Sequence, residues 1–208
     1  MTLEAFRQTR SRQKRAAIFA AARAMFRRDG FARAAMEEIA REAGVSTATL
    51  YRHFPSKAAL FEAVAAQSIE TLALGEAGGA PLPRLEALAS RYAALLCAPD
   101  TRGLLRMLIA ETGAGGDLSE RFYAAVKSQV GEAFAGAVIA AMEAGVVTPH
   151  DDPAHLAGQL QGMIEHGTLL RGLILGDEVE TLKPPAAIAA EALRTWLARW
   201  GAEAAPAR

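Results

Sequence analysis

A cluster of hydroxyl, guanidinium, imidazole and ammonium groups occupies one short stretch in the first third of the chain. Its polar and small members are Ser46, Thr47, Ala48, Thr49, Tyr51, Arg52, His53 and Lys57. Side chains of these types donate hydrogen bonds to phosphate oxygens and to the edges of bases, and a residue as small as Ala48 permits close approach to a groove. The stretch therefore predicts contact with double-stranded DNA rather than catalysis.

Signals on either side of this cluster predict the two helices that must position it. Met36–Ala43 carries apolar residues at helical spacing, and it is followed by Gly44, a residue type that adopts positive φ at little cost. Ser46 can cap a second short helix, Thr47–His53, through its hydroxyl. A helix, a tight turn and a second helix form the arrangement in which the second helix enters the major groove.

This part of the chain resembles a known family. The run AGVSTATLYRHFPSKAALF, preceded by MEEIARE, is similar to the DNA-binding domain of TetR-family transcriptional repressors. The positions that match the spacing of the family are Ala40, Gly44, Leu50, Tyr51, Phe54 and Lys57. The close resemblance covers roughly residues 12–62. Further along, LLRMLIAETGAGGDLSERFY and the helix after it look like the C-terminal domain of the AefR-like subgroup.

The resemblance implies roles for individual residues of the second helix. Thr47, Ala48 and Arg52 are expected to meet bases. The groups expected at phosphates are Thr49, Tyr51, His53 and Lys57. The chain departs from the family at Ala34-Ala35, where members often carry Thr or Ser. Hydroxyls there would cap the helix that begins at Met36 and touch phosphate, so that contact is missing here.

The composition of the 208-residue chain indicates an all-α protein with an uneven charge. Hydrophobic residues make up 51% of it, alanine is abundant and β-branched residues are sparse. The net charge is zero, yet residues 1–62 hold 12 Lys and Arg against 6 Asp and Glu, whereas the remaining 146 hold 11 against 17. A basic first third suits a domain that binds a polyanion, although a basic run alone also fits a solvated helix face.

Helix and loop signals predict about nine helices in two domains. Residues 1–11 are expected to fray, and the predicted helices span approximately residues 12–28, 36–43, 47–53, 57–74, 84–96, 102–112, 117–144, 153–175 and 184–200. Residues 1–62 would form a three-helix helix-turn-helix DNA-binding domain, and residues 63–208 a larger helical domain for effector binding and dimerisation. The long fourth helix would start beside DNA and end in the larger domain, so it could carry a displacement between them.

The last two predicted helices are apolar on more than one face. We expect them to form a two-fold dimer interface, a four-helix bundle built from two helices of each chain. The predicted interface residues are Leu160, Met163, Leu170, Leu173, Ile188, Leu193, Trp196, Leu197 and Trp200. The alternative is that both helices lie inside a monomer.

The resemblance also implies that a small-molecule effector, whose identity the sequence does not reveal, enters a cavity among predicted helices five to eight and moves the fourth helix. Such an effector must bind the DNA-incompetent arrangement more tightly than the competent one. The candidate lining residues are Arg106, Met107, Tyr123, Lys127, Met142, Met163 and His166. Arg106 is a possible partner for an anion, and plain packing is the alternative for each residue, above all for the methionines.

The larger domain shows little sign of catalytic or metal chemistry. His150, Asp151, Asp152 and His155 are metal-ligand types, but they lie at a loop-to-helix junction where Asp152 can act as a cap. No Gly-x-Ser-x-Gly motif is present. We therefore predict no enzyme, no metal and no cofactor.

The sequence also predicts where the protein resides. Cys97, the single cysteine, cannot form a disulfide within the chain, which suits a reducing cytoplasm. The N-terminus is polar and basic, unlike a secretion signal, and no apolar run reaches the ~18–20 residues that span a membrane.

Two functions from different classes fit these features. The first is a homodimeric, ligand-responsive repressor that binds a palindromic DNA operator and is released by its effector. The second is a helical protein-interaction module whose helix-turn-helix no longer reads DNA. The second reading rests on Ala34-Ala35 and on two glutamates beside the groove, Glu37 and Glu38.

Overall fold

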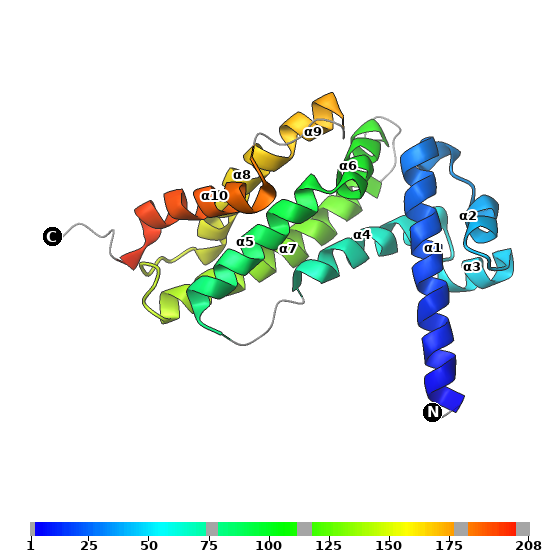
Figure 1. Cartoon of the computed structure of the whole chain (residues 1–208), viewed down its shortest axis with the longest axis horizontal. Helices are drawn as coiled ribbons and strands as arrows, with labels where there is room; N and C mark the ends of the chain where they lie inside the picture. Colours follow the sequence, from blue (N-terminus) through cyan, green and yellow to red (C-terminus); the bar gives the residue numbers. More distant parts are fainter. Residues whose placement is uncertain (1–2, 74–78, 112–117, 177–182, 203–208) are drawn as a thin grey trace. The chain divides into compact units, whose positions relative to one another are not determined.

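The computed structural model describes residues 3–73, 79–111, 118–176 and 183–202, and these are helical almost throughout (Figure 1). The helices are α1 (Leu3–Arg33), α2 (Met36–Glu42), α3 (Thr47–His53), α4 (Lys57–Ala73), α5 (Pro81–Cys97), α6 (Pro99–Glu111), α7 (Leu118–Glu143), α8 (Pro153–Thr168), α9 (Leu170–Leu175) and α10 (Pro185–Trp200). The described residues form no strand; Val147 and Gly201 make one isolated bridge. The predicted all-α class is confirmed.

The chain divides into two compact units that differ from a simple cut at residue 62. The first unit comprises residues 1–67 together with 103–122, and the second comprises residues 68–102 together with 123–208. The return of residues 103–122 to the first unit has a packing cause. Leu104, Met107 and Leu108 of α6 are buried in the same hydrophobic cluster as the helix-turn-helix residues.

The core of the first unit brings α1, α3 and α4 together. Ile18, Phe26 and Leu50 are completely or almost completely buried in it. Phe61 of α4 meets Phe26 edge-on, with ring centroids 5.5 Å apart, and it contacts Phe31 in the same way at 5.7 Å. Phe31 thus packs against both Phe26 of α1 and Phe61 of α4, and these aromatic contacts fix α4 against α1.

Helix α1 is longer at both ends than the predicted helix from Arg12 to Arg28. It begins at Leu3, so the expectation of a frayed segment over residues 1–11 is wrong for residues 3–11. At the other end the helix is interrupted at Gly30, whose φ of +77° is not helical. Glycine adopts this conformation without a steric penalty, which explains why the regular helix breaks here, close to the predicted end at residue 28.

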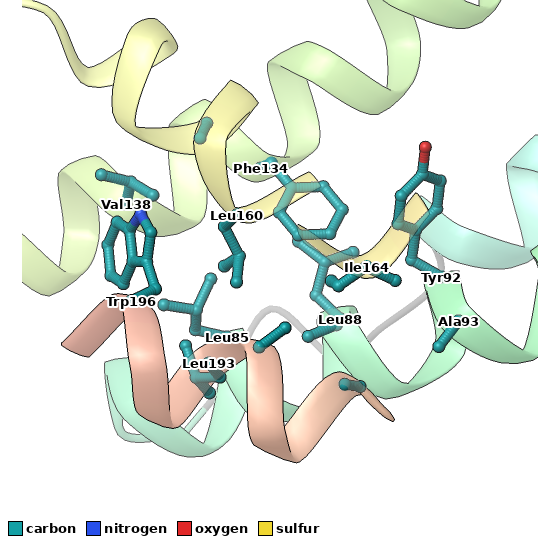
Figure 2. Packing of buried hydrophobic residues seen from close by; sticks show 14 of the residues in the cluster. Leu85, Leu88, Tyr92, Ala93, Phe134, Val138, Leu160, Ile164, Leu193 and Trp196 are labelled. Carbon is teal, nitrogen blue, oxygen red and sulfur yellow. The ribbon is translucent and has the colours of Figure 1, made fainter. Parts of the chain in front are cut away.

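The second unit has its own hydrophobic core, formed by α5, α7, α8 and α10 (Figure 2). Helix α10 packs along α5 and α8, and Trp196 is buried completely between them. The indole of Trp196 donates a hydrogen bond of 2.9 Å to the carbonyl oxygen of Leu156 on α8. The polar edge of this large side chain is therefore satisfied inside the core.

Boundaries in the second half of the chain also differ from the sequence prediction. The helix expected from Pro153 to Leu175 is divided at Leu169 into α8 and α9, and the hydroxyl of Thr168 donates to the carbonyl oxygen of Ile164 at the break. Helix α6 begins at Pro99, ahead of the predicted start at about residue 102. Proline is well tolerated in a first helical turn because the N–H it lacks has no partner there.

A search of the described helices for a long apolar span finds no segment that could cross a membrane.

Candidate nucleic-acid interface

The turn between α2 and α3 depends on one glycine and on backbone hydrogen bonds. Gly44 has a φ of +64°, and its N–H donates to the carbonyl oxygen of Arg41 at 3.2 Å. The N–H of Val45 donates to the carbonyl oxygen of Ala40 at 3.0 Å. This is a C-terminal cap in which a left-handed residue lets the chain reverse and satisfies the last carbonyls of the helix. It fixes where α3 begins.

Ser46 caps α3 as the sequence predicts. Its Oγ accepts a hydrogen bond from the N–H of Thr49 at 3.2 Å, and it lies 2.8 Å from the hydroxyl oxygen of Thr49. These two hydroxyls are therefore occupied at least partly with each other. An N-cap of this kind contributes roughly 1 kcal/mol of stability.

The remaining residues of α3 divide into one buried anchor and an exposed polar face. Leu50 is completely buried in the core of the first unit. Thr47, Ala48, Arg52 and His53 are exposed. Since a single apolar residue fixes the helix against α1 and α4, the opposite face of α3 can present its hydroxyl, guanidinium and imidazole groups outward.

Tyr51 is exposed but engaged. Its hydroxyl donates a hydrogen bond of 3.2 Å to Oε1 of Glu37 on α2. This hydrogen bond, more than partial burial, raises the pKa of the Tyr51 phenol. The one O–H of the phenol is donated to Glu37, and a phosphate oxygen can only accept, so a phosphate contact through Tyr51 requires the hydrogen bond to Glu37 to break.

Lys57, expected at a phosphate, is tied to the backbone of the first unit. Its ammonium donates to the carbonyl oxygens of Ala32 and Ala34 at 2.9 and 3.0 Å. The Nζ atom also lies 4.7 Å from the centroid of the Phe31 ring. An ammonium has three N–H groups, so one remains beyond these two hydrogen bonds. Lys57 therefore braces the turn between α1 and α2, a role that sequence spacing alone does not reveal.

The N-terminus of α2 lacks a side-chain cap. Ala35 occupies the cap position and makes no side-chain hydrogen bond, which is the consequence expected from the Ala34-Ala35 departure. Two acidic residues, Glu37 and Glu38, lie in the first turn of α2 instead. Carboxylates in the first turn of a helix stabilise it by interacting with the positive end of the helix dipole.

The seven residues predicted to line an effector cavity lie in different places. Met163 and His166 of α8 line one cavity together. Tyr123 is 64% exposed, and Met142 packs against the core of the second unit. Arg106 and Met107 line a cavity within the first unit. The side chain of Lys127 lies outside the described residues.

The predicted dimer residues also separate by burial. Leu160, Ile188, Leu193 and Trp196 are buried within a single chain, so they serve its own core. Their apolar pattern does not distinguish an inner face from an interface, which is why the sequence groups them together. Met163 and Leu170 are exposed, and Leu173, Leu197 and Trp200 are half-buried. Exposed apolar residues at Ile174 and Leu175, which the prediction omitted, extend this set along α9.

The histidine and aspartate cluster before α8 is occupied by local contacts. Oδ1 of Asp152 accepts from the N–H of His155 at 2.9 Å and caps α8. The ring of His150 accepts from the N–H of Asp152 at 2.9 Å and meets the ring of Trp200 edge-on. Among the described residues, no group of three or more His, Cys, Asp or Glu side chains could hold a metal ion.

One set of charged residues is absent from the sequence prediction. Arg102, Arg171 and Lys183 line the cavity that Met163 and His166 share. They come from α6, from α9 and from the segment before α10, so no motif in the sequence joins them. The feature that identifies this set is the contact of Arg102 with Gly172, and that contact exists only in the folded chain.

A capped helix-turn-helix with an outward polar face, in a chain with a second helical unit, is typical of a DNA-binding transcriptional regulator. Comparison with known sequences gives the family. The profile of the bacterial regulatory proteins of the tetR family matches residues 18–64, and that of the AefR-like transcriptional repressor C-terminal domain matches residues 83–202. The chain therefore belongs to the TetR family of transcriptional regulators, with a C-terminal domain of the AefR-like type.

Individual relatives agree with this assignment. The HTH-type transcriptional regulator UidR of Escherichia coli K12 is 41% identical over 63 residues, which are 30% of this chain and 32% of UidR. The chain thus spans about a third of the length of the curated relatives it matches. These relatives are HTH-type transcriptional regulators.

Two solved structures cover nearly all of the chain. A TetR-family transcriptional regulator from Mesorhizobium loti is 27% identical with a TM-score of 0.75, covering 92% of this chain and 98% of its own. The flavonoid-responsive regulator FrrA is also 27% identical, with a TM-score of 0.66 and coverage of 90% and 97%. The similarity therefore extends through both units.

Proposed function

We propose that this protein is a homodimeric cytoplasmic repressor that binds a palindromic operator and is released by a small organic effector. The observation that carries the proposal is the exposed polar face of α3, held outward by buried Leu50 and by the Ser46 cap. Thr47, Ala48 and Arg52 are the proposed base contacts. Thr49, Tyr51, His53 and Lys57 are the proposed phosphate contacts, of which Tyr51 and Lys57 must first release or share their present partners.

Dimerisation is the second part of the proposal. A groove in the second unit is lined by Gln159, Gly162, Met163, His166, Trp196, Arg199 and Trp200. Met163 of α8 and Leu170 of α9, the next helix along the chain, are both exposed. A second copy of the chain would cover these apolar groups by two-fold symmetry, and the same symmetry would place two α3 helices on successive half-sites.

The response to a ligand is the third part. The similar structure FrrA is a flavonoid-responsive regulator, which supports an organic effector here too. Helix α4 runs without interruption from Lys57, which follows α3 closely, to Ala73, so it carries residues of both units. We propose that ligand binding in the second unit shifts the population of states through α4, because a ligand can act only by binding one state more tightly.

The rival reading, a protein-interaction module that does not read DNA, draws support from two features. Tyr51 and Lys57 are engaged within the protein, and α2 lacks a side-chain cap. A module of this kind would retain the fold without the DNA contacts.

A fluorescence-anisotropy titration separates the two readings. The labelled duplex comes from the region upstream of the coding sequence of the protein, with a scrambled duplex of equal length and composition as control, at two salt concentrations. A regulator binds the native duplex more tightly than the control, and its affinity falls steeply with salt because each neutralised phosphate adds about 0.9 to the logarithmic slope. If both duplexes bind weakly and equally, a selection from random duplexes follows. Failure of that selection to enrich any sequence contradicts the proposal.

A further inference from the structure

Arg102 of α6 is a buried charge with few partners. Its side chain is only 3% exposed. One terminal nitrogen, Nη2, donates a hydrogen bond of 2.9 Å to the carbonyl oxygen of Thr168, whereas Nε has no hydrogen-bond partner in the described part of the chain. Burial of a guanidinium is costly unless a counter-charge or a full set of hydrogen bonds offsets it. The described residues supply no carboxylate for it.

The neighbouring thiol does not neutralise this charge. Cys97 is close enough to interact with Arg102, but burial is the stronger influence and raises the pKa of the thiol overall. A cysteine with a raised pKa stays protonated at neutral pH. The positive charge of Arg102 is therefore left without a negative partner among these groups.

The local structure is built to hold the guanidinium where it lies. Helix α8 ends at Thr168, so the carbonyl there lacks the helical partner that an interior residue has, and Arg102 supplies one. On α9, a Cβ atom at Gly172 would lie 2.4 Å from both Cζ and Nε of Arg102. Only glycine leaves the room that the guanidinium occupies.

A cavity of about 450 Å³ lies beside this arginine, within the second unit. Its volume falls in the range of ~300–1,000 Å³ that is usual for ligand pockets. Arg102, Arg171, Lys183 and His166 contribute cationic or potentially cationic groups, and Glu191 is the one carboxylate among the described lining residues. Glu191 is already bound by Lys183, which lowers the pKa of the carboxyl group.

The rest of the cavity wall is apolar. Met163 of α8 and Ile188 and Ala192 of α10 line it, and Thr195 adds a hydroxyl. At Gly167 a Cβ would lie 2.6 Å from Cγ2 of Ile188, so α8 and α10 approach closely at one wall. The cavity thus combines an excess of positive charge with an apolar surface.

We propose that this cavity binds an amphipathic organic anion, a carboxylate or sulfonate attached to an apolar body. The anionic group meets Arg102 and Arg171, and the apolar body lies against Met163, Ile188 and Ala192. Attraction between an anion and a buried guanidinium is strong because little water screens it. As an assignment of the effector class the inference rests on the proposed function, but as a binding site it stands independently.

Two matched fluorescent probes test the charge requirement on the full-length protein. 8-Anilino-1-naphthalenesulfonate carries a sulfonate, and N-phenyl-1-naphthylamine has the same aromatic body without it. We expect the sulfonate probe to bind the unaltered protein at least about tenfold more tightly. Arg102→Met should lower the affinity for the sulfonate probe by about tenfold or more and leave that for the neutral probe unchanged, as loss of a charged hydrogen bond predicts.

Further variants keep the test independent of folding. Arg171→Gln, on an exposed residue, should cause a smaller loss for the sulfonate probe, and Gly172→Ala should displace the guanidinium and weaken the same probe. Arg194→Gln is the matched control, because Arg194 is an exposed arginine of α10 that lines a different cavity. Circular dichroism confirms that each variant is folded. Octanoate should displace the sulfonate probe, whereas octanol should not.

Equal affinity for both probes overturns the proposal, as does a sulfonate affinity that neither Arg102→Met nor Arg171→Gln lowers. Met163 and His166 also line the proposed dimer groove, so light scattering follows the mass of the protein during titration. The operator titration on the same samples separates the two hypotheses. Operator binding without the charge-dependent probe binding rejects only the cavity, and the reverse result rejects only the repressor.

Discussion

At the scale of single residues, the side chains predicted to contact DNA differ in whether other groups of the protein already bind them. Thr47 and Arg52 are exposed, and no side-chain hydrogen bond or ion pair with another described residue holds them. Tyr51 and Lys57 have the same suitable chemistry but already bind Glu37 and the carbonyl groups of Ala32 and Ala34. Residue type therefore indicates what a side chain can bind, whereas its neighbours determine what binding would cost.

Thr47 should influence which sequence is bound. Thr47→Ala removes a hydroxyl and a methyl group from the exposed start of α3, and we expect the preference at one base pair to change by ~1–3 kcal/mol while other positions remain as they were. Competition titrations with single-base operator variants measure this. Thr195→Ala, on an exposed threonine of α10, serves as control. A uniform loss across all duplexes would assign Thr47 to a phosphate instead.

Lys57 should matter for folding as well as for DNA binding. Lys57→Ala leaves the carbonyl groups of Ala32 and Ala34 without their donor and removes the contact with Phe31. We expect a loss of ~1–3 kcal/mol in the free energy of unfolding, measured in urea, together with weaker binding to all DNA sequences and a flatter salt dependence. Lys14→Ala, on an exposed lysine of α1, should leave stability unchanged. Unchanged stability in Lys57→Ala would make it a phosphate contact only.

At the scale of elements, the helix ends are the features that fix the geometry. Gly30 ends the regular part of α1, Gly44 reverses the chain after α2 and Ser46 starts α3. These signals are local, so the sequence predicts them well. The break between α8 and α9 falls at Leu169, two residues after Gly167, and Arg102 binds the carbonyl group of Thr168 there.

Two substitutions of Ser46 should separate the effect of its cap on stability from its effect on DNA binding. Ser46→Ala should cost ~1 kcal/mol of unfolding free energy, because the N–H of Thr49 loses its acceptor. Ser46→Asp keeps a cap acceptor and should remain nearly as stable as the unaltered protein, but its negative charge should weaken DNA binding at low salt. Urea unfolding and anisotropy report the two effects. Normal DNA affinity in Ser46→Asp would show that α3 does not approach phosphate at this end.

The close approach of α8 and α10 can be tested through one glycine. Gly167→Ala places a methyl group against Cγ2 of Ile188, a β-branched side chain with few alternative rotamers. We expect it to lower the free energy of unfolding, measured in urea, by ~1–3 kcal/mol. Adding Ile188→Ala should recover part of this loss, so the double variant is less unstable than the sum of the single changes. Additive losses in the double-mutant cycle would indicate that the helices simply move apart.

At the scale of the whole molecule, the proposed repressor binds its operator as a dimer. Met163→Glu combined with Leu170→Glu places charges in the proposed interface and should convert a dimer into a monomer by light scattering, with a large loss of operator affinity. Ile139→Glu is the control, because Ile139 is a similarly exposed apolar residue of α7. A double variant that stays dimeric would place the interface elsewhere.

The sequence by itself determined the class of fold, the family and the helix-turn-helix. Periodicity, caps and the glycine at residue 44 act between neighbours along the chain, so they can be read from residue order. The helix ends at Ser46, Gly145 and Pro185 belong to the same group.

Only the tertiary structure decided which apolar residues form the core and which charges converge. Leu160 and Met163 are both apolar residues of α8, yet one is completely buried and the other is 40% exposed. Arg102 and Gly172 are separated by 70 positions in the numbering and meet because the fold of the second unit places the Arg102 side chain against α9. Such contacts depend on how distant segments share space, and one sequence alone carries no local signal for that.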